Sequence, residues 1–137
     1  MKKKSNSLQK IVVHFFSTLI LATIIVFFVH QFFLEKQQLP IYANKIVLAY
    51  VINSLLASTI FLTHFFLRNK YRNQLGFLFM YGSLLKFIVF FIFFNPSYKA
   101  DGTTSRLEFL AFFVPYLLCL IIEIRFLIKL LNLPKTR

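Results

Sequence analysis

Four long apolar runs, separated by short polar segments, dominate the pattern of hydrophobic and polar positions along this chain. The hydrocarbon core of a bilayer is spanned by roughly 20 helical residues at about 1.5 Å each, and every run is long enough. We therefore predict an all-α fold, an antiparallel four-helix bundle integral to the membrane. The expected helices cover about 11–33, 42–66, 75–94 and 107–131. The connections are too short for a separate soluble domain, so residues 1–137 form one transmembrane domain.

The first apolar run follows the basic start Met1–Lys4 and could be confused with a cleavable signal peptide. It is longer than a typical signal core, and no small-x-small cleavage site follows it. We therefore expect it to be a retained membrane span.

The distribution of Lys and Arg predicts the orientation, because cations in short connections stay on the cytoplasmic side. The N-terminal segment, the second connection and the C-terminal end together carry eleven cations, and the opposite side carries four. The eleven are Lys2, Lys3, Lys4, Lys10, Arg68, Lys70, Arg72, Arg125, Lys129, Lys135 and Arg137; the four are Lys36, Lys45, Lys99 and Arg106. Both termini are thus expected in the cytoplasm, and the localisation expected is the bacterial cytoplasmic membrane.

The formal charge of +12 would indicate nucleic acid as the partner of a soluble protein. Here topology and contact with anionic lipid headgroups explain the charge, and the 20 Phe lie mostly inside the spans rather than on a basic face. We predict membrane lipids and no nucleic acid as partners. Cys119 is the one cysteine, which excludes an intramolecular disulfide and a thiolate metal cluster.

Lys86 lies near the middle of the third run, where a charge is unexpected. A central Lys opposes insertion by about 2.5 to 3.5 kcal/mol, whereas the Leu, Ile, Val and Phe of that span favour it by about 4 to 8 kcal/mol. The helix can insert, but the cation requires a partner, a polar cavity or an ion path.

Glu123 is the predicted partner of Lys86. It is expected about 6 Å to the cytoplasmic side of the midplane, and Lys86 about 2 Å to the other side. A helical side chain points toward its own N-terminus, so Lys86 should point to the half in which Glu123 lies. Asn53 is expected at nearly the same depth in the second span, where its amide could accept a hydrogen bond from Lys86.

Small residues beside this group predict close helix packing. Gly82 and Ser83 lie one turn before Lys86, and Ser54 and Ser58 form a small-xxx-small pair beside Asn53. Two interpretations of the polar group stay open. It is either a structural clamp between helices or a functional group, which contacts a partner protein or lines an ion or proton path.

No catalytic, cofactor or metal site is predicted. His14 and His64 are expected at similar depths, but two histidines without nearby carboxylates are thin evidence for a metal. The sequence also has no metalloprotease, phosphate-loop or nucleophile-elbow motif, so we do not expect an enzyme.

Two short segments resemble the ATP synthase protein I (AtpI-like) family of small four-helix bacterial membrane proteins. They are Tyr50–Asn53, with Ile52 where the family has Pro, and Gly82–Lys86, with Ser83 where a carboxylate commonly follows the Gly. The similar region covers about 50–94. The family correspondence includes Asn53 and Lys86, whereas Glu123 rests on the depth argument alone.

The resemblance implies an accessory protein of the bacterial F-type ATP synthase membrane sector, which helps the ring of c subunits assemble or stay stable. Its implied partners are ATP synthase membrane subunits. Some family members have been proposed to move magnesium or calcium, but divalent ions prefer oxygen ligands, and Lys86 would repel them. The alternatives are a small cation or proton transporter or channel, which would oligomerise, and a permanent small subunit of another membrane complex.

Overall fold

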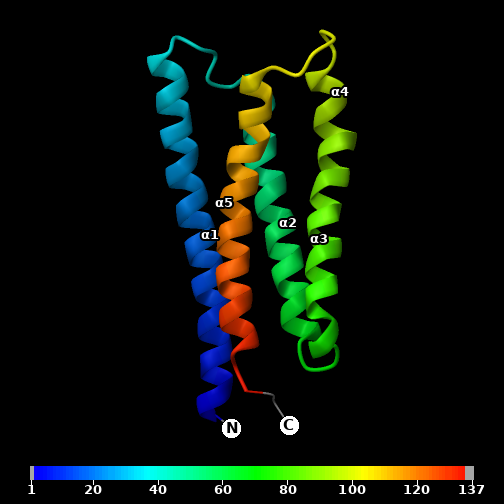
Figure 1. The fold of residues 1–137 in the computed structure, drawn as a ribbon. Coiled ribbons are helices and arrows are strands. Elements are labelled where there is room, and N and C mark those ends of the chain that lie inside the picture. Colours follow the sequence, from blue (N-terminus) through cyan, green and yellow to red (C-terminus); the bar gives the residue numbers. More distant parts are fainter. Residues whose placement is uncertain (1, 135–137) are drawn as a thin grey trace.

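The computed structural model describes residues 2–134, which form four long helical segments running alternately up and down (Figure 1). The elements in chain order are α1 (Lys2–Lys36), α2 (Ile46–Leu67), η1 (Arg72–Gln74), α3 (Leu75–Val89), η2 (Phe90–Phe94), α4 (Asn95–Tyr98) and α5 (Arg106–Leu131). Four segments are long and apolar enough to cross a membrane, and the described residues contain no strand. The predicted all-α membrane fold is confirmed. Lys135 and Arg137 of the predicted cytoplasmic cations lie outside the described residues.

The first two helices differ from their expected bounds at their N-terminal ends. α1 begins at Lys2 instead of near position 11, because a helix can continue through polar residues beyond the apolar run. α2 begins at Ile46 instead of position 42. Asn44 and Lys45 have φ angles of 61° and 54°, in the left-handed region, which ends the preceding turn before the helix starts.

The third span continues four residues beyond the expected end at position 94, through the short helix α4 (Asn95–Tyr98). The intervening η2 is a π-helix, in which the Asn95 N–H donates to the Phe90 carbonyl five residues earlier. Pro96 lies in the first turn of α4, where its missing N–H matters least. The wider turn therefore lets the helix pass a proline that would be expected to end it.

The core is built around α5, which contributes to three clusters of buried side chains. In the first cluster, Phe15 of α1 stacks on Phe61 of α2 with ring centroids 3.9 Å apart, and Phe126 of α5 meets Phe15 edge-on. In the second cluster, Phe94 of η2 packs against Phe112 of α5 at 4.9 Å. These aromatic contacts join all four spans.

α2 and α5 are the inner helices, whereas α1 and α3 are peripheral. Within the apolar window of each span, 39% of the α2 residues are buried but only 11% of those of α1. The start of α1 and the end of α5 lie at the same end of the bundle, as the predicted topology requires (Figure 1).

Candidate functional site

A buried ion pair joins α3 to α5. The Lys86 Nζ donates to Glu123 Oε2 at 2.6 Å, and both side chains are 0% exposed. The ammonium also lies 5.7 Å from the ring centroid of Tyr116, one of the core aromatic residues of α5. A charge-assisted hydrogen bond and an aromatic face thus replace part of the water that both groups lose on burial.

Asn53 is fully buried but does not accept a hydrogen bond from Lys86, which corrects the expectation from the sequence. Its Nδ2 donates to the Ala49 carbonyl of the same helix at 2.9 Å. The amine of Lys86 is instead directed to Glu123, because a carboxylate is a stronger acceptor for an ammonium than an amide oxygen is.

Two buried acceptors, one on Glu123 of this pair and one on Asn53, have no hydrogen-bond partner among the described residues. They are Oε1 of Glu123 and Oδ1 of Asn53. A buried polar atom without a partner loses its hydration without compensation. Asn53 and Glu123 therefore each have capacity for one further hydrogen-bond donor.

His64 is a buried polar residue at the same end of the bundle as the loop between α2 and α3. Its Nδ1 lies 2.7 Å from the Ile60 carbonyl, and its Nε2 lies 3.2 Å from the Leu75 carbonyl at the start of α3. The Nδ1 of His14 lies 2.6 Å from the Lys10 carbonyl oxygen within α1. No group of three or more His, Cys, Asp or Glu that could hold a metal ion occurs within residues 2–134.

The predicted small residues lie at two different helix contacts. A Cβ on Gly82 would be 3.0 Å from the Ile60 side chain, so the glycine allows α3 to approach α2 closely. Ser83, beside it, is half-buried. Ser54 and Ser58 instead line a hollow between α1 and α2, and each hydroxyl donates to the carbonyl four residues earlier in α2.

This hollow is a groove of about 370 Å³, which we call the α1/α2 groove. The Thr23 and Ser54 hydroxyl oxygens lie 3.5 Å apart along it. The other lining residues are apolar or aromatic: Phe16, Leu19, Ile20, Ile24, Tyr50, Val51 and Leu55, with Ser58 completing the set. The sequence indicated close packing at the two serines but not their partner helix, because a small-xxx-small pair does not specify which helix packs against it.

The fold defines a multi-pass helical membrane protein, and a buried ion pair joins two of its described spans. The chain belongs to the DUF6168 family, described as a family of unknown function, which matches residues 7–134. No curated protein and no solved structure matches the chain.

Proposed function

We propose that this protein is an accessory protein of a larger membrane complex and that it binds a helix of that complex in the α1/α2 groove. The observation that supports this proposal is the groove itself. It lies between two membrane spans, and its hydroxyl residues Thr23, Ser54 and Ser58 are small enough to let another helix approach. The four apolar spans support a location in a membrane, for which we propose the bacterial cytoplasmic membrane.

The state of the ion pair supports an accessory role over transport by a single chain. Lys86 and Glu123 are both 0% exposed and bonded to each other, so no water reaches them in this conformation. A charge that must move ions would need an open path to it. As a clamp, the pair instead fixes α3 against α5 and leaves the outer surfaces of the bundle for contact with partners.

The partner to test first is the membrane sector of F-type ATP synthase, on the basis of the resemblance of Tyr50–Asn53 and Gly82–Lys86 to the ATP synthase protein I family. A single c subunit is an apolar hairpin before it joins the ring. A groove with small hydroxyl residues could cover one face of such a hairpin until neighbouring subunits replace it.

The test is capture of the tagged protein from native membranes in mild detergent, followed by mass spectrometry. Ser58→Leu would fill the groove, and Thr59→Leu is the matched control because Thr59 is exposed and does not line it. We expect ATP synthase membrane subunits with the wild type and the control but not with Ser58→Leu. Equal recovery with all three proteins would exclude the groove as the binding site. Recovery of a different complex in fixed stoichiometry would identify a permanent subunit instead.

A second candidate function is a cation or proton path through an oligomer, which the two unpartnered oxygens of Glu123 and Asn53 favour. Acceptors of this kind can bind a hydrated proton or a cation when a path opens. The test is flux into vesicles containing the purified protein. Flux that is lost on Glu123→Gln and on Asn53→Leu would support this function, and absence of flux from the wild type would exclude it.

A further inference from the structure

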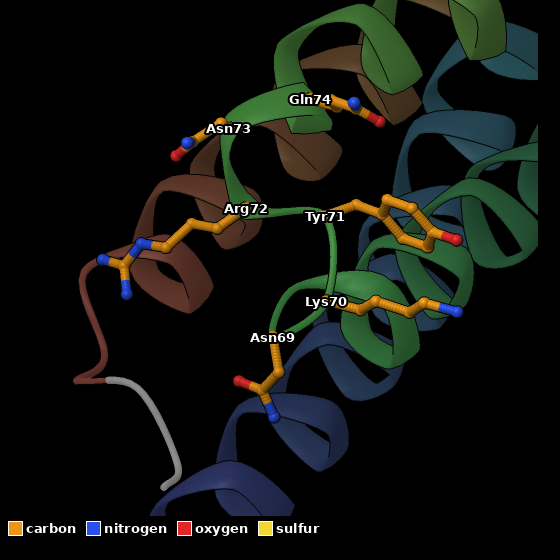
Figure 2. Close-up of a pocket in the computed structure, with 6 residues that line it drawn as sticks. All are labelled: Asn69, Lys70, Tyr71, Arg72, Asn73 and Gln74. Atoms are coloured by element: carbon orange, nitrogen blue, oxygen red, sulfur yellow. The ribbon is translucent and has the colours of Figure 1, made fainter.

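The loop between α2 and α3 encloses a polar hollow of about 210 Å³, which we call the loop pocket. It is lined by six consecutive residues, Asn69, Lys70, Tyr71, Arg72, Asn73 and Gln74 (Figure 2). This loop joins two membrane spans, so it lies where the bilayer meets water, whichever way the protein is oriented. The pocket is therefore at the depth of lipid headgroups.

An apolar groove of about 420 Å³ adjoins the loop pocket, and we call it the Phe77 groove. It shares Tyr71 and Gln74 with the pocket and continues along α3. Its remaining lining residues are Leu67, Phe77, Leu78 and Tyr81. A polar hollow at the interface thus lies next to an apolar one on the membrane side, with two lining residues in common.

The charge of the loop pocket indicates that its ligand is an anion. Lys70 and Arg72 are exposed cations, the loop contains no acidic residue, and the first turn of α3 contains none either. The 3-10 turn η1 runs directly into α3, and its N-cap residue Tyr71 makes no side-chain capping bond, so no side chain offsets the positive end of the helix dipole in this loop. Both features favour an anion over a neutral or cationic group.

We propose that the loop pocket and the Phe77 groove together form a specific binding site for one anionic diacyl phospholipid. The phosphate lies at Lys70 and Gln74, and one acyl chain follows Phe77 and Leu78 toward Tyr81. This site is independent of the accessory function proposed above, since it uses a different surface and requires only that the protein lie in a membrane.

The two cations of the loop have different roles in this site. Lys70 and Tyr71 extend side by side, with the Lys70 Nζ 5.2 Å from the Tyr71 ring centroid, and Gln74 points to the same side (Figure 2). Arg72 points to the other side and donates to the Leu131 carbonyl at the end of α5 at 3.0 Å. Lys70 therefore carries the contact with the phosphate, whereas Arg72 ties the loop to α5.

The chain has no Trp, so a single Trp can report on lipid in the Phe77 groove. We would place Phe77→Trp in the full-length purified protein, in vesicles of phosphatidylcholine with a rising fraction of brominated phosphatidylglycerol, which quenches nearby Trp fluorescence. Phe66→Trp is the matched reporter, because Phe66 is exposed at the C-terminal end of α2, near the loop, and does not line the groove. It measures quenching by bulk lipid.

We expect the Trp at position 77 to be quenched at a lower fraction of brominated lipid than the Trp at position 66. Lys70→Gln should lower the apparent affinity for the brominated lipid, measured by quenching at position 77, about fivefold, as expected for the loss of one cation near a lipid surface. Lys129→Gln, which removes an exposed cation of α5 that does not line the pocket, should leave it unchanged. Brominated phosphatidylcholine should show no preference between the two reporters.

Equal quenching at both positions, or equal effects of Lys70→Gln and Lys129→Gln, would overturn the site and indicate only general attraction to an anionic surface. Inorganic phosphate should not displace the lipid, because it cannot occupy the Phe77 groove. Displacement by phosphate would mean that the site binds an anion without an acyl chain, which would overturn the lipid assignment. Lys70 is exposed, so its substitution should not disturb folding, which circular dichroism can check.

Discussion

Lys86 and Glu123 are joined by a single hydrogen bond of 2.6 Å across two membrane spans, with neither side chain exposed. Removing one member of a buried pair leaves the other charge uncompensated, at a cost of roughly 3 to 5 kcal/mol. We expect Lys86→Met and Glu123→Leu each to lower the free energy of unfolding by about that amount. The double variant should recover most of the loss, because no charge is then left behind.

The measurement for the ion pair is reversible unfolding of the four proteins in detergent, compared as a double-mutant cycle. Additive losses would mean that Lys86 and Glu123 do not stabilise each other in the folded protein.

Gly82 and Ile60 are in close contact, and a Cβ on the glycine would lie 3.0 Å from Ile60. We expect Gly82→Ala to destabilise the protein by about 1 to 3 kcal/mol through overpacking. Gly76→Ala is the control, because no atom lies within 4 Å of its added Cβ, and it should be neutral or slightly stabilising through helix propensity. Thermal unfolding of both variants checks the prediction, and Gly82→Ala unfolding like Gly76→Ala would contradict it.

Tyr98, the last residue of α4, ties the third span to the connection between α1 and α2, since its hydroxyl donates to the Asn44 carbonyl at 2.7 Å. Tyr98→Phe leaves that carbonyl without its donor and should cost about 0.5 to 1.5 kcal/mol of the free energy of unfolding. Tyr42→Phe is the matched control, because Tyr42 is 72% exposed and should tolerate the same change. If the two variants unfold at the same temperature, the bond contributes nothing.

The orientation predicted from the cations can be measured in whole cells with a membrane-impermeant thiol reagent. In a Cys119→Ser background, Lys99→Cys should be labelled from outside, and Lys10→Cys only after the cells are opened. Both side chains are exposed, Lys10 in the N-terminal part of α1 and Lys99 directly after α4. The start of α1 and the end of α4 lie at opposite ends of the bundle (Figure 1). Labelling of Lys10→Cys in intact cells would reverse the predicted topology.

The spans could be predicted because their apolar runs match the thickness of a bilayer, and lipid forces the backbone to satisfy its own hydrogen bonds. The proposed proximity of Lys86 and Glu123 also followed from the sequence, since depth and side-chain direction depend only on helix rise and chain direction. The structure places these two residues together at 2.6 Å.

Other features depended on contacts that periodicity does not encode. The hydrogen bond of Asn53 to its own helix depends on the competition for the Lys86 amine, which is a property of the folded core. The π-helix at Phe90–Phe94 depends on how the helix passes Pro96. The α1/α2 groove depends on which face of α1 packs against α2, and the small-xxx-small pair in α2 does not specify that face.

The placement of Glu123 on the last helix also bears on the order in which the protein is made. Chains are synthesised from the N-terminus, so the third span reaches the membrane while its counter-ion is still inside the ribosome or the insertion machinery. Until α5 enters, Lys86 has no carboxylate to bond and the third span is held by its apolar residues alone. Arrival of α5 therefore completes the three clusters of buried side chains and neutralises the buried cation in one step, so the bundle is complete only when its last span has inserted.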